Sequence, residues 1–200
     1  MATYNFPNIT PTSQTFELVT NTKMFQSPLS NAIQTVSRKG SYWKTSMVFN
    51  NLSGAERSEL QAFIAKLDGQ THRMRIRDYG AVRYGNANAL TTPQVNGSGQ
   101  TGSTLIANGA AANVSSYFAA GDYISFKNEF HIVTNDVDAD GSGNISIPLA
   151  PPIRKATTDN DEIEFLSPVG VFMMTNNPMW RTQAPYFSSI TIEAIEDVLA

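Results

Sequence analysis

Residues 40–79, GSYWKTSMVFNNLSGAERSELQAFIAKLDGQTHRMRIRDY, hold a strand pattern, a helix pattern and a second strand pattern in immediate succession. From Trp43 to Phe49, mostly apolar residues alternate with mixed ones, which predicts a strand with one buried face. From Arg73 to Arg77, arginines alternate with apolar residues, which predicts a returning strand. The stretch therefore predicts a strand, a helix and a strand.

The helix is expected at about 54–67. Ser53 and Glu56 form the S-x-x-E capping box, whose side chains satisfy free amides of a first helical turn. Asp68 and Gly69 supply the left-handed exit that helix C-termini favour. Apolar residues at i, i+3, i+4 and i+7 form one stripe along this helix. The residues expected in the core of the whole unit are Trp43, Met47, Phe49, Leu60, Phe63, Ile64 and Leu67.

The composition is that of a folded chain with buried cores, because 41% of its 200 residues are hydrophobic and 10% are aromatic. A net charge of -3 gives no overall attraction for nucleic acid or anionic membranes. With no cysteine, the chain has no disulfide framework and no thiolate zinc site. No signal peptide pattern or long apolar run is present, so we expect a soluble protein without membrane insertion.

After the second predicted strand the chain changes in texture. Residues 80–121 are mostly Gly, Asn, Ala, Ser and Thr, and about five short strand candidates lie within 85–165, the count of a small closed barrel of the OB type. Strand patterns of the first kind then resume. The sequence therefore predicts a mainly β fold: a β-barrel or sandwich domain with one short helix, from 1–84 and 166–200, and an inserted small OB-like β-barrel domain at 85–165.

The N-terminal region is expected to form an arm or meander. Residues 1–30 are rich in Pro, Thr, Asn and Ser, with β-like runs at 15–19 and 22–25. A further strand candidate at 33–37 is followed by a short Arg-Lys-Gly turn at 38–40. This spacing predicts a hairpin with the strand that contains Trp43.

The sharpest local motif is Asp136-x-Asp138-x-Asp140-Gly141, which matches the opening of an EF-hand calcium loop. Ile147 stands where that loop needs a bidentate glutamate, and no helices flank the motif. The same residues suit a turn between two strands. The turn is the favoured interpretation, and a metal site at Asp136, Asp138 and Asp140 is the alternative.

No group of residues predicts catalysis. His72 and His131 each lie among apolar residues in different predicted domains, where a structural role is expected. The acidic run at 159–164 is typical of a solvated edge rather than of a catalytic pair. We therefore expect that the protein is not an enzyme and needs no cofactor.

The basic cluster of the chain contains Arg73, Arg75, Arg77 and Arg83, and Arg38 and Lys39 are candidates to lie near it. A nucleic-acid surface would need aromatic residues on the same face, and only Tyr79 is aligned with these arginines. Arginine is also enriched at protein interfaces, where its planar group forms bidentate salt bridges. A protein interface is favoured, and nucleic-acid binding is the alternative.

The order of these elements resembles the β-barrel domain of the distal tail proteins of bacteriophages with long non-contractile tails. In that family a strand with an aromatic residue, here Trp43, precedes a helix with an E-x-x-x-L-x-A-F-like stripe, here from Glu56 to Phe63. Residues 121–165 resemble the OB-like second domain of the shorter members. The resemblance covers most of the chain, including the insertion of one domain into the other.

The resemblance implies a structural protein of the virion, located at the phage tail tip and assembled in the host cytoplasm. Its barrel domains would form a homohexameric ring that joins the tail tube protein to the baseplate hub, tail-tip and fibre proteins and leaves a channel for DNA. A closed ring uses two different surfaces of each subunit. The candidates for these surfaces are Arg57 and Glu59 on the helix and Arg73, Arg75 and Arg77 on the following strand.

Two other functions stay open. Another tail-tube or baseplate adaptor protein would share the same assembly. A carbohydrate- or nucleic-acid-binding module would instead use the OB-like segment.

Overall fold

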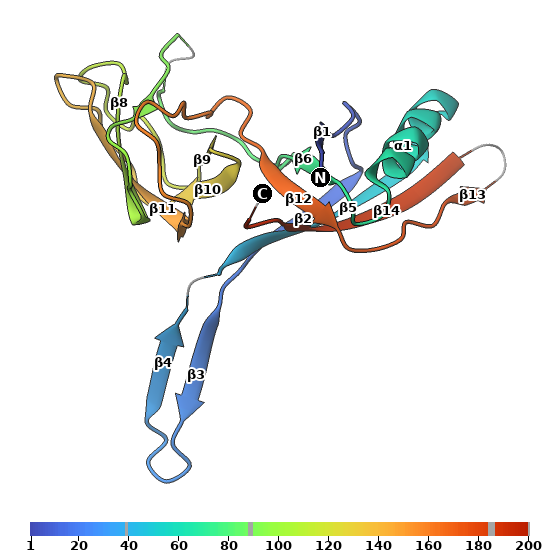
Figure 1. Ribbon diagram of the computed structural model, residues 1–200, viewed down its shortest axis with the longest axis horizontal. Helices are drawn as coiled ribbons and strands as arrows, with labels where there is room; N and C mark the ends of the chain where they lie inside the picture. The colour runs from blue at the N-terminus through green and yellow to red at the C-terminus, as the bar shows by residue number, and fades with distance from the viewer. Residues whose placement is uncertain (39, 88–89, 184–186, 200) are drawn as a thin grey trace.

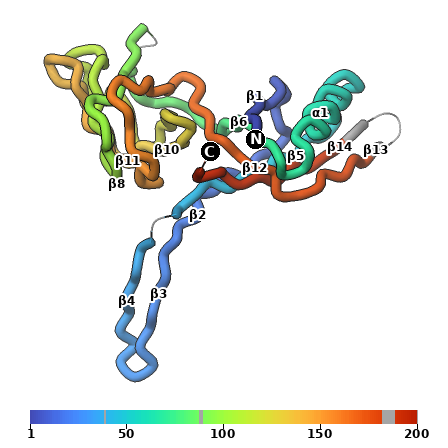
Figure 2. The backbone as a smooth tube through the Cα atoms, in the orientation of Figure 1, coloured from blue at the N-terminus to red at the C-terminus, as the bar shows by residue number. Residues whose placement is uncertain are grey.

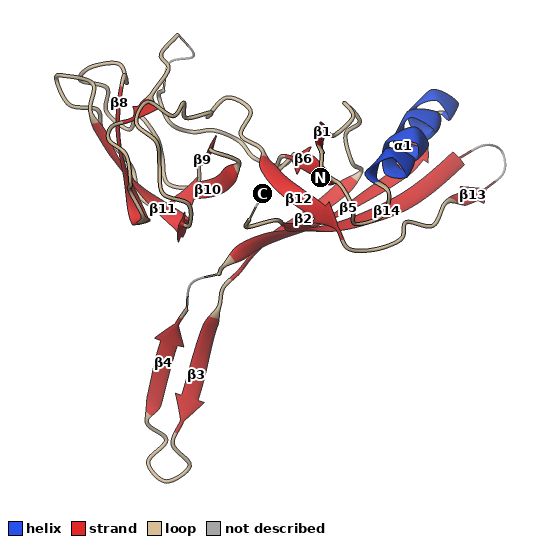
Figure 3. Cartoon of the chain, in the orientation of Figure 1, coloured by secondary structure: helices blue, strands red, loops and turns tan. Residues whose placement is uncertain are grey.

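Strands dominate the computed structural model, which describes residues 1–38, 40–87, 90–183 and 187–199. Within these residues there is one helix, which Figure 3 shows beside the larger of two main sheets. The mainly β class with one short helix is thereby confirmed. The elements, in chain order, are β1 (Thr3–Asn5), β2 (Ser13–Val19), β3 (Thr22–Gln26), β4 (Ile33–Ser37), β5 (Tyr42–Leu52), α1 (Gly54–Leu67), β6 (Arg73–Ile76), β7 (Gln94–Val95), β8 (Gly102–Asn108), β9 (Tyr123–Phe126), β10 (Glu129–Val133), β11 (Ile145–Ile153), β12 (Gly170–Met174), β13 (Arg181–Gln183) and β14 (Phe187–Glu196).

The larger sheet combines both ends of the chain. Its strand order is β1-β6-β12-β14-β5-β2, and β13 pairs with β14 beside this path. β1 and β6 are parallel, whereas the other neighbouring pairs are antiparallel. The sheet curls into a half-barrel, with α1 alongside β5 and β14 (Figure 1). We call this sheet and its helix the main unit.

The β5–α1 segment forms as its local patterns require. Along β5 the buried side chains of Trp43, Met47 and Phe49 alternate with more exposed ones. The capping box is present, because Ser53 Oγ accepts a hydrogen bond from Glu56 N at 3.3 Å while Ser53 N donates to Glu56 Oε2 at 2.9 Å. Such a cap is worth about 1 kcal/mol.

The helix covers the sheet through its apolar stripe. Leu60, Phe63 and Leu67 are buried against the core that contains Phe49, whereas Ile64 is only partly buried at its edge. The chain leaves the helix at a residue in the left-handed conformation, Asp68, as its C-cap. The core residues expected from the sequence thus lie together, with Ile64 at the margin.

The N-terminal strands form one long ribbon, which corrects the expected hairpin. β2 pairs with β5, and β3 pairs with β4, so the ribbon continues through both pairs. Residues 33–37 and the strand of Trp43 therefore follow one another on the same side of the ribbon and do not pair. The turn lies at 27–32 instead, closed by a hydrogen bond from Ser27 N to Ala32 O at 2.9 Å. The turn expected at 38–40 includes Lys39, which is outside the described residues.

The second main sheet is inserted between strands of the first. Its order is β7-β8-β11-β10-β9, with antiparallel pairing throughout. The strand expected at 162–166 forms only backbone bridges, from Glu162 to Gln94 of β7 and from Glu164 to Ser125 of β9. One short segment thus joins both edges of the sheet. We call this sheet and its loops the inserted unit.

Buried contacts fix the inserted unit to the main unit. Phe130 of β10 lies in the core of the main unit, and its carbonyl oxygen accepts a hydrogen bond from Trp43 Nε1 at 2.8 Å. Arg154, just after β11, binds both carboxylate oxygens of Glu196 at 2.6 and 2.9 Å. A Cβ at Gly170 would lie 3.0 Å from Phe130 Cβ, so the joint is closely packed there. The two units are joined by more than their covalent links.

Among the described residues no helix is long and apolar enough to span a bilayer.

Candidate assembly surfaces

The β3–β4 ribbon, residues 22–37 with its turn, projects away from both units (Figure 2). We call it the arm. All ten of its strand residues are exposed. An isolated two-stranded ribbon is at best marginally stable in water. The arm would therefore be stabilised by packing against another surface.

Apolar side chains are exposed along the length of the arm. The turn carries Leu29, which is 98% exposed. The other large apolar side chains exposed on the arm are Met24, Phe25, Ile33 and Val36. The pairing of the two strands places Met24 and Ile33 on one face of the ribbon and Phe25 and Val36 on the other. Exposed apolar side chains grouped in this way usually mark a surface that binds another molecule. Sequence reasoning noted the strand pattern here but missed the exposure, because the segments that cover a strand are set by contacts between distant parts of the chain.

The arm and its base carry charge of one sign. Residues 20–40 contain Lys23, Arg38 and Lys39 and no acidic residue. A surface that receives the arm would therefore combine apolar and acidic groups.

Arg73, an expected interface residue, is occupied inside its own chain. Its Nε lies 2.5 Å from Asp197 Oδ2, and its Nη1 donates to Gln70 O at 2.7 Å. Burial by itself raises the pKa of Asp197, but the hydrogen bond and charge of Arg73 outweigh it and hold that pKa below its usual range. Arg73 thus has an ionic partner within its own chain, and its role as an interface residue stays a prediction.

Arg75 and Arg77, by contrast, line a groove of about 210 Å³ and form no ion pair within the described residues. Arg75 Nη1 makes a long contact of 3.4 Å with Asn5 Oδ1. The Cζ atom of Arg77 lies 4.8 Å from the centre of the Tyr79 ring. The pKa of Tyr79 is raised, and burial is the main cause. We call this surface the arginine groove, lined by Asn5, Phe6, Pro7, Asn8, Arg75, Arg77, Tyr79 and Val169.

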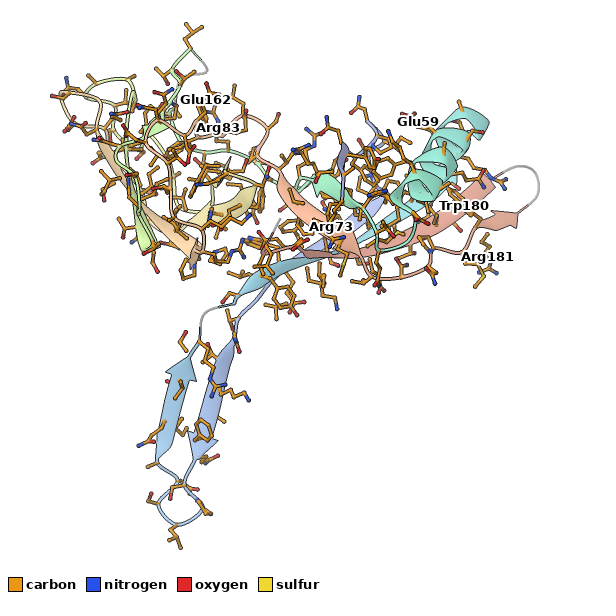
Figure 4. The ribbon with its side chains drawn as sticks, viewed as in Figure 1. Glu59, Arg73, Arg83, Glu162, Trp180 and Arg181 are labelled. Carbon is orange, nitrogen blue, oxygen red and sulfur yellow. The ribbon has the colours of Figure 1, made fainter. Side chains whose placement is uncertain are left out.

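The two helix candidates differ in environment. Arg57 lies over the ring of Trp180, with 6.0 Å from Cζ to the ring centre. Glu59 is exposed on α1 (Figure 4). Trp180 and the exposed Met179 also line part of an open cavity of about 670 Å³. The sequence did not point to this cavity, because the loop residues and strand residues that form it are distant along the chain.

The three aspartates of the calcium-like motif hold loops together. Asp136 Oδ1 accepts from Ala120 N at 2.8 Å, and Asp138 Oδ1 accepts from Ser116 N at 2.7 Å. The hydrogen bonds that Asp140 accepts, chiefly from the Asn144 side chain, lower its pKa. Among the described residues there is no group of three or more side chains suited to hold a metal. These contacts match the turn interpretation.

A buried polar cluster lies at the joint between the units. His131 Nδ1 lies 2.8 Å from Pro151 O, and its Nε2 lies 3.3 Å from Glu129 Oε2. Glu129 also accepts from the backbone amides of Arg154 and Lys155, at 3.1 and 2.9 Å. Burial by itself raises the pKa of Glu129. The hydrogen bond from His131 and the neighbouring donors lower this pKa by more, so the net pKa of Glu129 lies below its usual value. Glu129 and His131 thus connect β10 to the end of β11 and to the residues that follow it.

His72 also has a structural contact. Its Nδ1 accepts a hydrogen bond from Ala2 N at 3.2 Å, and its ring meets Tyr4 edge-on. This contact holds the first strand against the residue that precedes β6.

The arm and the arginine groove are the surfaces best suited to bind a macromolecule, since one exposes apolar side chains and the other unpaired charge. A comparison of the chain with known protein families gives no match, and neither does a comparison with curated proteins.

Proposed function

We propose that the protein is a structural subunit of a bacteriophage tail tip, of the distal tail type. Six copies form a ring that connects the tail tube to the baseplate hub and tail-tip proteins and leaves a channel for DNA. The subunit is made in the host cytoplasm and ends in the virion. The proposal includes no enzymatic activity and no cofactor.

The projecting arm is the observation that carries this proposal. Its apolar side chains gain stability only when another surface removes them from water, at about 25 cal/mol per Å² of apolar area. An arm on one side of a subunit and a receiving surface elsewhere on the next make a head-to-tail contact. Repetition of such a contact closes a ring when the rotation between neighbours allows it.

The inserted unit supports the same proposal. Its five strands and the bridges from Glu162 and Glu164 to both edges are compatible with a small OB-like barrel. We propose that this barrel projects from the ring and meets tail-tip or fibre proteins.

Self-association of the purified protein tests the proposal. Light scattering is expected to give a mass of six 21.8-kDa chains, and negative-stain images are expected to show rings. Replacing Phe25 and Val36 with serine should reduce the ring population, because the substitutions remove two exposed apolar side chains from the arm. A matched control replaces the exposed Leu199, outside the arm, with serine. Single chains at every concentration, with no density for the protein at the tail tip, would refute the proposal.

A second tail-assembly function is supported by the same arm. Another tail-tube or baseplate adaptor would also associate through an exposed apolar ribbon. A labelled protein located along the tube rather than at the tail tip would favour the adaptor.

The nucleic-acid-binding alternative receives less support. Residues 85–165 contain nine acidic and three basic residues, a formal charge of -6, which repels a phosphate backbone.

A further inference from the structure

Charge is divided unevenly between the two parts of the chain. The segment 85–165 has a formal charge of -6, whereas the rest holds eleven basic and eight acidic residues, a formal charge of +3. Opposite charges on different parts of one chain favour contacts between copies, in which the acidic part of one faces the basic part of the next. This charge distribution therefore predicts that the segment 85–165 of one copy meets the rest of another copy, where charged side chains on both surfaces have no partner within the described residues of their own chain.

On the basic side, the arginine groove brings together two arginines that form no ion pair within the described residues. Arg75 and Arg77 lack an ionic partner within the described residues, whereas Arg73 and Arg154 each bind a carboxylate within the chain, at 2.5 and 2.6 Å. Phe6 contributes apolar surface to the groove. A carboxylate that enters such a site exchanges water for two guanidinium groups beside apolar walls, where ionic hydrogen bonds are strong.

The arm offers no carboxylate to this groove, because Lys23 is its one charged residue. The two arginines therefore favour an occupant that carries acidic groups.

On the acidic side, Glu162 is the member of the 159–164 run whose carboxylate is free. It is exposed and makes no hydrogen bond or ion pair within the described part of the chain. Its neighbours are occupied by nearby amides: Asp159 accepts from Gly97 N at 2.7 Å, and Asp161 accepts from Thr158 N at 2.7 Å.

The backbone at Glu162 is held in place by its bridge to Gln94. In Figure 4, Glu162 and Arg83 lie in the inserted part of the molecule, whereas Arg73 lies in the main unit. Arg83 is committed nearby, because its Nη1 donates to Ala87 O at 2.6 Å and its guanidinium lies 5.3 Å over the Phe165 ring. Glu162 is thus an exposed carboxylate, on a backbone held by its bridge, that forms no ion pair within the described residues.

We propose that the arginine groove of one copy binds the Glu162 carboxylate of a second copy. The guanidinium groups of Arg75 and Arg77 donate to the two carboxylate oxygens, and the inserted unit of one subunit thereby lies against the main unit of the next. This inference rests on the proposed ring and names one of its contacts.

Reciprocal charge reversal tests the contact. Arg77→Glu and Glu162→Arg are each expected to weaken self-association about tenfold or more, because each places like charges in contact. The double variant restores the pair with its charges exchanged, so its association constant should return to within about threefold of the natural protein's. Glu193→Arg is the matched control, since it makes the same charge change at an exposed glutamate of the main unit and should leave association unchanged.

The measurement is sedimentation velocity over a concentration series at low and physiological salt, with circular dichroism of each variant to verify the fold. Association should weaken as salt increases. Normal association of both single variants, or losses that simply add in the double variant, would overturn this contact while the natural protein still forms rings. A natural protein that stays monomeric would instead overturn the proposed function together with the contact.

Discussion

Replacing Arg154 with methionine removes the cation that joins the two units. Its side chain is 13% exposed and lies against carboxylates of Glu196 and Glu129 that are 1% and 2% exposed. The substitution leaves both acids buried without this cation, and breaking a buried ion pair on one side costs about 3–5 kcal/mol. For a chain of this size each kcal/mol lowers the melting temperature by about 2–4 °C. The expected loss is therefore about 6–20 °C, with Arg38→Met, an exposed arginine at the base of the arm, as the control.

Differential scanning calorimetry measures this effect, and the shape of the transition is informative as well. The two units have separate cores and are held together at the joint, so the variant should broaden or split the single transition expected of the natural protein. A melting temperature within about 2 °C of the natural value, with one sharp transition, would show that Arg154 does not hold the units together.

Three further predictions concern stability. Gly170→Ala places a Cβ 2.8 Å from Phe172 Cε2, so it should cost about 1–3 kcal/mol in urea denaturation, whereas Gly54→Ala, with no atom within 4 Å, should not destabilise. The folded-state pKa of Glu129 lies below its ordinary 4.5, so the ionised carboxylate stabilises the fold above that pH, and this stabilisation is lost as the pH falls through the folded-state pKa. Glu129→Gln should therefore reduce the decrease in melting temperature that the natural protein shows on acidification. Removing divalent ions with a chelator should leave the melting temperature unchanged, because the carboxylates at 136–140 bind amides, and a clear decrease would support the calcium alternative.

Local patterns in the sequence were enough to place the central strand and helix. The capping box at Ser53 and the alternation from Trp43 onward involve residues a few positions apart, so their geometry follows from backbone rules. The helix bounds and most of the core residues could be read in this way.

Pairing between distant segments could not be read in the same way. Alternation predicts a strand at 33–37 but does not say which strand it pairs with, and a hairpin with the next strand was the simplest choice. The structure pairs it with β3 instead. The ion pair between Arg73 and Asp197 could not be predicted either, because the two residues lie 124 positions apart. Contacts between distant residues also decide that the arm is exposed, that Arg154 pairs with Glu196 and that the carboxylate of Glu162 has no partner within the described residues.

An image of the assembled protein at a resolution that traces its backbone tests the proposed ring most directly. We expect a closed ring of six chains around a channel, with each arm packed on a neighbouring subunit. A monomer, or an assembly in which the arms remain exposed to solvent, would contradict it.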